Sequence, residues 1–328
     1  MTEPSAPRPA GAAPLAVPGL VARAARLHYE FSLTHQETAA VLGVSRVKVT
    51  RLLKQAREAG IVVITVLSDL SPFAEVEERL AAAIGLRESI VVPAGGGGPG
   101  NSLRSMLARG AASYLERVVR DGLVVAVGLS RTVAEVPAWL GHPRPARASF
   151  VSLAGALPAG GHGSGNPYQA TDALAAAFGG TAEHLHAPVI VRSDEAAEVL
   201  RADPSISRTL EQAVTADVAL VGVGGRDDRI DFQQGTQVTP AEWTSLMAQG
   251  MVGDIGGRFF DRSGSEIEHE LNRRVIGLSL EEFRKIPVRL VAAGGPSKTE
   301  ALTAALRGGL ITVLVTDITT ANALIEGA

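Results

Sequence analysis

Cationic and hydroxyl-bearing side chains recur at helical spacing between residues 45 and 54. Side chains three or four positions apart lie on one face of a helix, so these groups are expected to form one basic surface. Such a surface can donate hydrogen bonds to phosphates and to base edges in the major groove of DNA. The residues predicted to contact DNA are Gln36, Ser45, Arg46, Val47, Lys48, Thr50, Arg51 and Lys54.

A second group of polar residues follows an apolar stretch in the larger part of the chain. The segment "LVVAVGLSRT" has the pattern of a buried strand followed by Gly128, Ser130, Arg131 and Thr132. Glycine lets backbone N–H groups turn toward an anion, and hydroxyl and guanidinium groups donate hydrogen bonds to phosphate oxygens. A capped turn beside a surface arginine is the alternative, and the spacing alone leaves both interpretations open.

Three further residues complete the predicted effector site. Lys298 in "AAGGPSKTE" is either a charge partner for phosphate or a solvated lysine, and Ser297 is expected to cap the next helix with Glu300 in the capping-box position. Asp254, between glycines, either accepts hydrogen bonds from sugar hydroxyls or caps a turn. Asn166 ends a glycine-rich loop and either binds ligand or caps a helix. Predicted strand ends also carry Asp217, Gly222, Gly224 and Asp317, which suit ligand contacts or turns equally.

Sequence motifs for catalysis or metal binding are weaker than those for DNA and effector binding. The segment "GLSRT" departs from the G-x-S-x-G nucleophile elbow at its last residue, and no recognisable His/Asp context follows. His184 and His186 in "HLH" have no clear third metal ligand. The chain has no cysteine, which excludes thiolate catalysis and Cys-ligated metals. We therefore predict no catalytic residue, metal site or cofactor; the alternative is a sugar-phosphate isomerase or hydrolase with an appended DNA-binding module.

The basic surface requires helices that hold it in place. Apolar spacing predicts a helix over residues 20–29. A capping box formed by Thr34 and Glu37 starts a second helix that stops at a glycine, and Ser45 caps a third that runs to about Ala59. The segment "IVVITV" after these helices has the pattern of a strand. Three helices in so short a stretch predict a compact module.

Small and apolar residues at the junction of the second and third helices indicate a helix-turn-helix, in which two helices cross closely. The residues predicted to fill the junction are Ala39, Gly43, Val44, Val49 and Leu52. A plain helical hairpin with a solvated cationic face is the alternative. Thr38 occupies a position where an aliphatic residue is usual, so its hydroxyl is expected to bond a local carbonyl.

Beyond the module, apolar runs alternate with helical stretches. An amphipathic helix in "SPFAEVEERLAAAIGL" is expected to connect the module to the body and to suit a dimer contact. The predicted strands are "SIVVPA", "LVVAVG", "SFVSLAG", "ADVALVGVG", "VRLVAAGG" and "ITVLVTD". Several are apolar on both alternations, as strands covered on both faces must be. The pattern predicts an α/β protein: a small all-α helix-turn-helix domain, then a larger Rossmann-like, mostly parallel domain. Glycine-rich loops lie at 95–101 and 154–166, and the second is long enough for a lid.

Charge also divides the chain. Residues 18–66 contain seven Lys/Arg and three Asp/Glu, a net charge of +4, and residues 1–17 are neutral. Residues 67–328 therefore carry −7, which completes the total of −3. A basic module on an acidic body predicts a polyanionic partner for the module. The predicted domains are a disordered tail at 1–17, a helix-turn-helix domain at 18–66 and an effector and oligomerisation domain at 67–328.

Composition predicts a cytoplasmic protein with no membrane partner. No apolar run reaches the roughly 18 residues that span a bilayer. The first residues carry little positive charge and a hydrophobic stretch broken by proline, unlike a secretory signal. The absence of cysteine also fits a reducing compartment.

Several segments together resemble one protein family. "LTHQETAAVLGVSRVKVTRLLKQAREAGIV" is similar to the N-terminal module of the SorC family of sugar-responsive bacterial transcriptional regulators. The resemblance continues through "VGLSRTV", "ADVALVGVG", "GMVGDIGGRFFDRSG", "RVIGLSLEEFRKIPVRLVAAGGPSKTEAL" and "LRGGLITVLVTDITTANALI". It implies an effector domain similar to the sugar-phosphate isomerase and CoA-transferase fold, a phosphorylated sugar as effector, and a homodimer or homotetramer.

The resemblance also bears on individual residues. It implies that the loop at 128–132 contacts the sugar phosphate, although the family usually has Trp-Gly where this chain has Leu129 and Ser130. It implies that the segment around Asp254 lines the effector pocket. The predicted function is a DNA-binding regulator whose affinity for double-stranded operator DNA is controlled by a phosphorylated sugar. A helix-turn-helix used for protein contacts is a further alternative.

Overall fold

The protein divides into two compact units, residues 1–69 and 70–328. The computed structural model describes residues 19–62, 71–96, 100, 102–141, 143–157, 167–228, 236 and 238–328. The tail predicted at 1–17 and most of the strand predicted after the third helix lie outside the described residues. So do Asn166 and most of the predicted lid loop. Each unit is described by itself.

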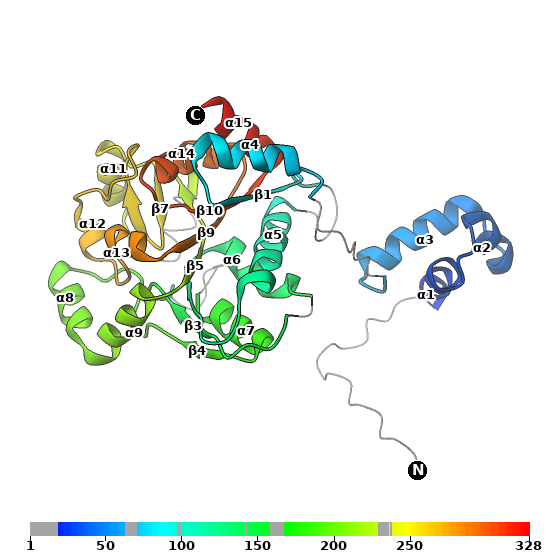
Figure 1. Cartoon of the computed structure of the whole chain (residues 1–328), viewed down its shortest axis with the longest axis horizontal. Helices are drawn as coiled ribbons and strands as arrows, with labels where there is room; N and C mark the ends of the chain where they lie inside the picture. The colour runs from blue at the N-terminus through cyan, green and yellow to red at the C-terminus, as the bar shows by residue number, and fades with distance from the viewer. Residues whose placement is uncertain are drawn as a thin grey trace, which may run out of the picture. The chain divides into compact units, whose positions relative to one another are not determined.

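The small unit consists of helices, as predicted (Figure 1). They are α1 (Gly19–Ala25), the π-helical η1 (Arg26–Glu30), α2 (His35–Leu42) and α3 (Arg46–Glu58). The predicted first helix is therefore wrong in its second half, where the backbone widens into a π-helix. There the N–H of Phe31 donates to the carbonyl of Arg26 (3.2 Å), a span of five residues rather than four.

Helices α2 and α3 begin at the predicted capping residues. Thr34 Oγ1 accepts from the backbone N–H of Glu37 (3.2 Å), and the Glu37 carboxylate accepts from the backbone N–H of Thr34 (2.8 Å). The Glu37 carboxylate also accepts from the Thr34 hydroxyl (2.7 Å), and the hydrogen bonds from the hydroxyl and the backbone N–H of Thr34 lower the pKa of the Glu37 carboxyl. Gly43 ends α2 with φ +64°, a left-handed conformation that glycine adopts without strain. Ser45 caps α3 by accepting from the N–H of Lys48 (3.2 Å).

The core of the small unit lies between α1, α2 and α3. Ala39, Val49 and Leu52 are buried in it, as predicted for a helix-turn-helix junction. The expectation for Thr38 is wrong: its side chain is fully buried, and Oγ1 has no hydrogen-bond partner. A buried, unpaired hydroxyl costs free energy relative to an apolar group of the same size, so Thr38 weakens this core.

The large unit is built on a parallel seven-stranded sheet, with strand order β1-β10-β9-β5-β2-β3-β4. The strands are β1 (Glu88–Val92), β2 (Val124–Val127), β3 (Ser149–Ser152), β4 (Thr181–Glu183), β5 (Val218–Val221), β9 (Val288–Ala292) and β10 (Val313–Asp317). Six of them match the predicted apolar runs. β4 was not predicted, because "TAE" is short and carries a charge on an exposed edge.

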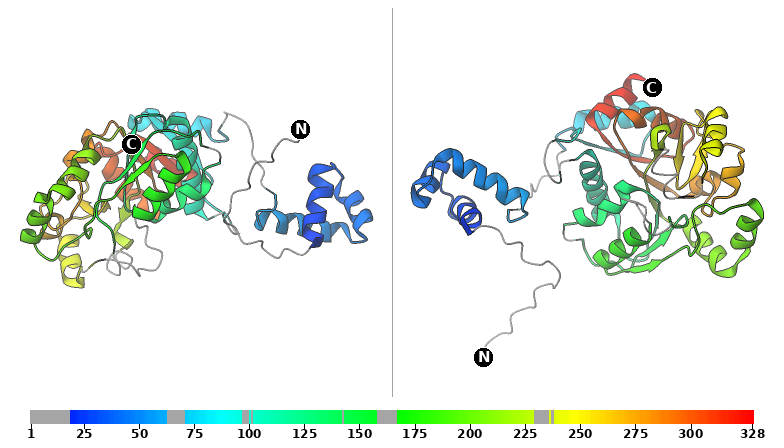
Figure 2. Two further views of the ribbon diagram at one scale, coloured as in Figure 1. Left: turned by 90° about the horizontal axis from the view of Figure 1, so that it is seen from below. Right: turned by 180° about the vertical axis from the view of Figure 1, so that it is seen from behind.

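Helices cover both faces of this sheet (Figures 1 and 2). The described helices of the large unit are α4 (Ala74–Ile84), α5 (Leu103–Val118), α6 (Arg131–Glu135), α7 (Pro167–Phe178), α8 (Asp194–Ala202), α9 (Pro204–Val214), α11 (Pro240–Ala248), α12 (Glu270–Arg273), α13 (Leu280–Lys285), α14 (Thr299–Arg307) and α15 (Ile318–Glu326). Short 3₁₀ turns are η2 (Val136–Trp139), η3 (Arg226–Asp228) and η4 (Pro296–Lys298). None of the helices among the described residues is both long and apolar enough to cross a bilayer.

Strand residues alternate between two apolar cores, which explains why the strands are apolar throughout. On β2, Val125 and Val127 belong to the core beneath α5 and α7, whereas Ala126 belongs to the opposite core with α13 and α14. On β10, Val313 and Val315 alternate with Leu314 in the same way. Period-two alternation between two buried faces is the arrangement expected of a doubly covered parallel sheet.

Helix α4 is part of the large unit rather than a free connector. Leu80 is fully buried, and Val76 and Ile84 pack against the same core. The Glu77 carboxylate accepts from the backbone N–H of Val91 on β1 (2.8 Å). The apolar face of α4 is therefore used within its own domain, and the dimer contact stays a prediction.

A small antiparallel sheet, which was not predicted, joins β6 (Gly224–Gly225), β7 (Gly253–Ile255) and β8 (Arg258–Phe260). Its strands are two or three residues long, and β6 and β7 contain glycine, so they have no apolar alternation that a sequence pattern would reveal. The strands pair Gly224 with Asp254 and Ile255 with Arg258. This sheet brings Asp254 next to the end of β5.

Candidate DNA-binding surface and effector site

The exposed face of α3 carries the predicted DNA contacts. Every one of the eight predicted residues is exposed, including Gln36 on α2 and Ser45 before α3. The opposite face of α3 is buried through Val49, Leu52 and Leu53. The helix therefore separates the residues that hold the fold from those that face outward. Lys54 also approaches Glu58 on the same helix (3.7 Å), an exposed pair of little energetic weight.

One side chain on this surface was not predicted. The His35 ring Nδ1 lies 3.2 Å from Thr50 Oγ1, which connects the first residue of α2 to the outer face of α3. Thr50 Oγ1 also lies 3.3 Å from the carbonyl oxygen of Arg46. His35 and Thr50 are fifteen positions apart, so no local spacing pattern links them. Only the crossing of α2 and α3 brings them together.

In the large unit, the predicted effector residues lie where the order of the strands reverses. From β2 the chain continues to β3 on one side, whereas from β5 it continues to β9 on the other. In parallel sheets, ligands bind outside the carboxyl ends of strands at such a point. Gly128 follows β2 and Gly222 follows β5, so the two predicted loops lie side by side.

Ser130 packs directly on the end of β5. A Cβ atom placed on Gly222 would lie 2.4 Å from Ser130 Oγ, so only glycine leaves room for the serine. Ser130 Oγ also accepts from the backbone N–H of Thr132 (3.1 Å) and caps α6. The capped turn weighed as an alternative is therefore formed, and the serine hydroxyl still has its proton to donate. Arg131 and Thr132 are half-buried in the first turn of α6.

Asp254 and Lys298 lie beside Gly224 and Gly225, which follow Gly222 at the end of β5. A Cβ atom on Gly224 would lie 1.8 Å from Asp254 Oδ1, and one on Gly225 would lie 3.7 Å from Lys298 Nζ. Ser130, Asp254 and Lys298 therefore all contact residues 222–225. Three residue steps of extended chain span at most about 11 Å, so these side chains border one short segment. Asp254 Oδ2 also accepts from the N–H of Gly257 (3.2 Å).

The loop that carries Lys298 is held from beneath. The N–H of Gly295 donates to Asp317 Oδ2 (2.7 Å) and to Thr320 Oγ1 (2.8 Å). Asp317 is buried at the end of β10 and also caps α15. The predicted cap by Ser297 is wrong, because the residue that precedes α14 is Lys298 and no side chain caps that helix.

Other predicted positions lie apart from this cluster. Asp217 precedes β5 and accepts from the N–H of Val124 (2.9 Å), so it lies at the opposite end of the sheet. His184 bonds Asp172 through Nε2 (2.9 Å). Within the described ranges, no group of three or more His, Cys, Asp or Glu side chains is arranged to hold a metal ion. The role of Asn166 stays a prediction because this residue lies outside the described residues.

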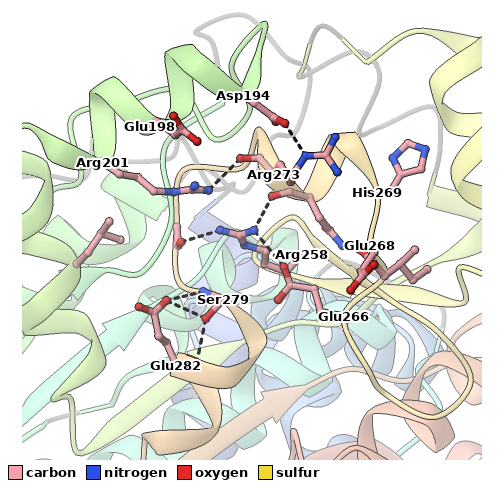
Figure 3. A pocket seen from close by; sticks show the side chains of 14 residues that line it. Asp194, Glu198, Arg201, Arg258, Glu266, Glu268, His269, Arg273, Ser279 and Glu282 are labelled. Atoms are coloured by element: carbon pink, nitrogen blue, oxygen red, sulfur yellow. Dashed lines mark hydrogen bonds and ion pairs between the residues drawn. The ribbon is translucent and has the colours of Figure 1, made fainter.

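A separate cavity of about 720 Å³ lies beside α8 and the segment 266–282 (Figure 3). Its floor includes Arg258, which is almost fully buried and donates to the carbonyl oxygens of Leu278 (3.1 Å) and Gly277 (3.2 Å). Burial lowers the pKa of the Arg258 guanidinium, and the charge of Glu266 opposes that effect. Because these contacts are internal, Arg258 stabilises the segment that follows α12.

His269 lines the same cavity and caps α12. Its Nδ1 accepts from the backbone N–H of Leu271 (3.1 Å), which requires an unprotonated nitrogen at that position. Nε2 lies 3.3 Å from Ser245 Oγ. Burial lowers the pKa of His269. The fold therefore holds His269 in its neutral form.

Comparisons with known proteins agree with this division. The model of a Crp-like helix-turn-helix domain matches residues 19–68, and that of a "Putative sugar-binding domain" matches residues 68–326. The transcriptional regulator LsrR of Klebsiella pneumoniae is 32% identical over 95% of this chain and 94% of its own length. The chain belongs to the SorC family of sugar-binding transcriptional regulators. It is a regulator with a helix-turn-helix and a sugar-binding domain.

Two solved structures of transcriptional regulators have the same fold. The sugar-binding domain of a transcriptional repressor from Vibrio fischeri is 31% identical and covers 77% of this chain and 98% of its own, with a TM-score of 0.71. The full-length sorbitol operon regulator SorC from Klebsiella pneumoniae covers 94% of this chain and 98% of its own, with 24% identity and a TM-score of 0.70. The second likeness shows the fold alone.

In this SorC-family chain, the long-range contacts of three structurally important residues were not predicted from the sequence. His35, Asp317 and Arg258 each act through contacts with segments distant in the sequence. Asp317 alone had a local signal, since it ends an apolar run and precedes a helix. Its hydrogen bond to the Gly295 turn depends on β9 and β10 being neighbours in the sheet.

Proposed function

We propose that a phosphorylated sugar binds along residues 222–225 and controls the affinity of the helix-turn-helix for operator DNA. The observation that supports this most directly is the convergence of Ser130, Asp254 and Lys298 on that segment. A sugar phosphate needs both donors for its phosphate and an acceptor for its hydroxyls. The cluster supplies both kinds of group beside one segment at the end of β5.

The proposed contacts follow from charge. The Lys298 ammonium pairs with the phosphate, and Ser130, Arg131 and Thr132 donate further hydrogen bonds to its oxygens. The Asp254 carboxylate accepts from sugar hydroxyls. Gly128 leaves room for Val221 of β5 rather than for a ligand, and its N–H donates to the carbonyl of Leu220 (2.9 Å). Asn166 is proposed as a further ligand contact.

For the DNA contacts, we propose that α3 enters the major groove. Arg46 and Arg51 read base edges, and Val47 contacts a thymine methyl group. Lys48 and Lys54 contact phosphates, as do Gln36 and Ser45 beside them.

The functional division is proposed at residues 18–66 and 67–328. A homodimer or homotetramer would present paired helices to half-sites related by two-fold symmetry.

The test is a thermal-shift screen of the full chain against phosphorylated sugars and their unphosphorylated counterparts. We expect at least one phosphorylated sugar to raise the melting temperature, and its free sugar to do so much less. Lys298→Ala should abolish the shift. Lys285→Ala, which removes an exposed lysine from α13, is the matched control and should retain it. An undiminished shift in Lys298→Ala would remove that residue from the site.

The same incubation tests the proposal that the protein is not an enzyme. After prolonged contact with the stabilising sugar phosphate, mass spectrometry and NMR should recover the compound unchanged. Isomerised or dephosphorylated product that scales with protein concentration would instead support a sugar-phosphate isomerase or hydrolase.

A further inference from the structure

His35 stands at the junction of the two helices of the helix-turn-helix. It is the first residue of α2, and its half-buried ring reaches Thr50 on the exposed face of α3. Thr50 is one of the proposed DNA contacts, and Gln36, another of them, follows His35 directly. The imidazole therefore lies on the same surface as the residues proposed to contact operator DNA.

The hydrogen bonds around Thr50 determine which nitrogen of His35 carries a proton. The Thr50 hydroxyl has one proton, which it donates to the Arg46 carbonyl oxygen (3.3 Å). Its oxygen then accepts from His35 Nδ1–H (3.2 Å). In the neutral ring this arrangement leaves Nε2 as the nitrogen with a lone pair. A second proton at Nε2 therefore adds a positive charge and a donor without breaking the bond to Thr50.

His28 on η1 holds the His35 ring in place. The two rings meet edge to face, with centroids 4.9 Å apart and an angle of 67° between their planes. His28 Nδ1 donates to the carbonyl oxygen of Leu33 (2.7 Å), which anchors its own ring. Of the nearby charged side chains, Glu37 is engaged with Thr34 and Glu30 pairs with Arg26 (2.8 Å). Thus η1 presents His28 to His35, and α3 presents Thr50 and the backbone of Arg46.

We propose that His35 is a further DNA contact, whose Nε2 takes up a proton when the operator binds and pairs with a backbone phosphate. This inference rests on the proposed DNA-binding face of α3 and deepens it. A phosphate beside the ring favours the charged form of histidine. The DNA-bound protein then holds more protons than the free protein, so operator affinity rises as the pH falls. For one proton the change is at most about tenfold per pH unit.

The experiment measures operator affinity against pH. The full chain first selects its preferred duplex from a random-sequence DNA library, and fluorescence anisotropy then gives Kd for that duplex between pH 5.5 and 8.0 at constant ionic strength. We expect affinity to rise several-fold from high to low pH. His35→Gln keeps an N–H donor for Thr50 but cannot gain a charge, so its affinity should stay nearly constant between pH 5.5 and 8.0.

Two further variants separate His35 from other histidines. His186→Gln, which changes an exposed histidine of the large unit, should retain the full pH dependence. His28→Gln should retain a pH dependence too, since His28 supports the ring without facing the phosphate. A flat wild-type profile, or a His35→Gln profile as steep as the wild type, would overturn the proposal.

Failure of the underlying DNA-binding proposal has a different signature. If the full chain selects no duplex, or if its binding does not weaken with added salt, the proposed face of α3 is itself wrong. Salt-dependent binding with no dependence on pH would leave that face intact and overturn only the role of His35.

Discussion

The two units of this regulator place their functional side chains in opposite ways. In the small unit, the proposed DNA contacts project from the exposed face of α3, and the buried residues lie on its other side. In the large unit, Ser130 and Asp254 are fitted against glycines at the end of β5. The exposed side chains of α3 can change without disturbing the fold. Ser130 and Asp254 are part of the packing, so a change at either residue is expected to affect both ligand binding and stability.

The largest effect is expected where the packing is tightest. Gly224→Ala would bring a Cβ atom to 1.8 Å from Asp254 Oδ1, so the Asp254 side chain must move. We expect a loss of about 3 kcal/mol or more in the free energy of unfolding, at the upper end of overpacking effects, and loss of the sugar-phosphate response. Chemical denaturation and the thermal-shift assay measure both.

Gly141→Ala is the matched control in the same unit. Its added Cβ would lie 3.5 Å from the Glu116 carboxylate, an ordinary contact, so stability should change by less than about 1 kcal/mol. If the Gly224 variant is as stable as this control and still responds to ligand, then binding and packing are not coupled in the large unit.

The next effect concerns the exposed face. Arg46→Ala and Arg51→Ala should each cost about 1–3 kcal/mol in operator binding and relax sequence specificity. Unlike Gly224→Ala, they should leave the melting temperature unchanged, because both side chains are exposed. Lys54→Ala should weaken binding to all DNA sequences alike. It should also reduce the slope of log K against log salt concentration by about one. Operator affinity that survives both arginine substitutions would contradict the assignment of α3.

A smaller effect is expected from His269. Burial lowers its pKa in the folded state, so the unfolded chain takes up a proton first as the pH falls. Stability is therefore full above the ordinary histidine pKa of 6.5 and is lost as the pH falls below it. Protonation also removes the cap of α12, worth about 1 kcal/mol. Denaturation between pH 5 and 8 should show this loss, and His269→Asn, which keeps a capping group without titrating, should show less of it.

The smallest effect is expected at Thr38. Thr38→Val replaces a buried, unpaired hydroxyl with a methyl group of similar size and should stabilise the small unit by about 0.5–1 kcal/mol. Both tryptophans lie in the large unit, so hydrogen exchange of peptides from α2 and α3 is the suitable measurement. Faster exchange in the variant would show that the hydroxyl has a partner.

The features that could be predicted from the sequence are those with local determinants. The helix-turn-helix was predictable because its determinants are local: caps at Thr34 and Ser45, a glycine between the helices, and a basic face of helical period. The parallel sheet was predictable for a similar reason, since each strand is an apolar run. Two predictions failed: the Thr38 hydroxyl is buried without a partner, and the Ser297 cap is missing.

The candidate effector site lies between these extremes. Its residue types were predictable because each follows an apolar run, but their meeting was not. Ser130 and Lys298 are far apart in sequence and come together only because β2, β5 and β9 are consecutive in the sheet. Asp254 reaches them through an antiparallel sheet of glycine-rich strands that have no apolar pattern.

The most direct test of the account is a reciprocal titration. Operator affinity is measured with and without a saturating amount of the sugar phosphate that gives the largest thermal shift, and affinity for that compound is measured with and without operator. The account predicts the same factor in both directions, about 5- to 150-fold, because coupling between sites is reciprocal. Lys298→Ala should abolish both changes while leaving operator affinity in the absence of ligand intact. A sugar phosphate that binds tightly yet leaves operator affinity unchanged would contradict the account.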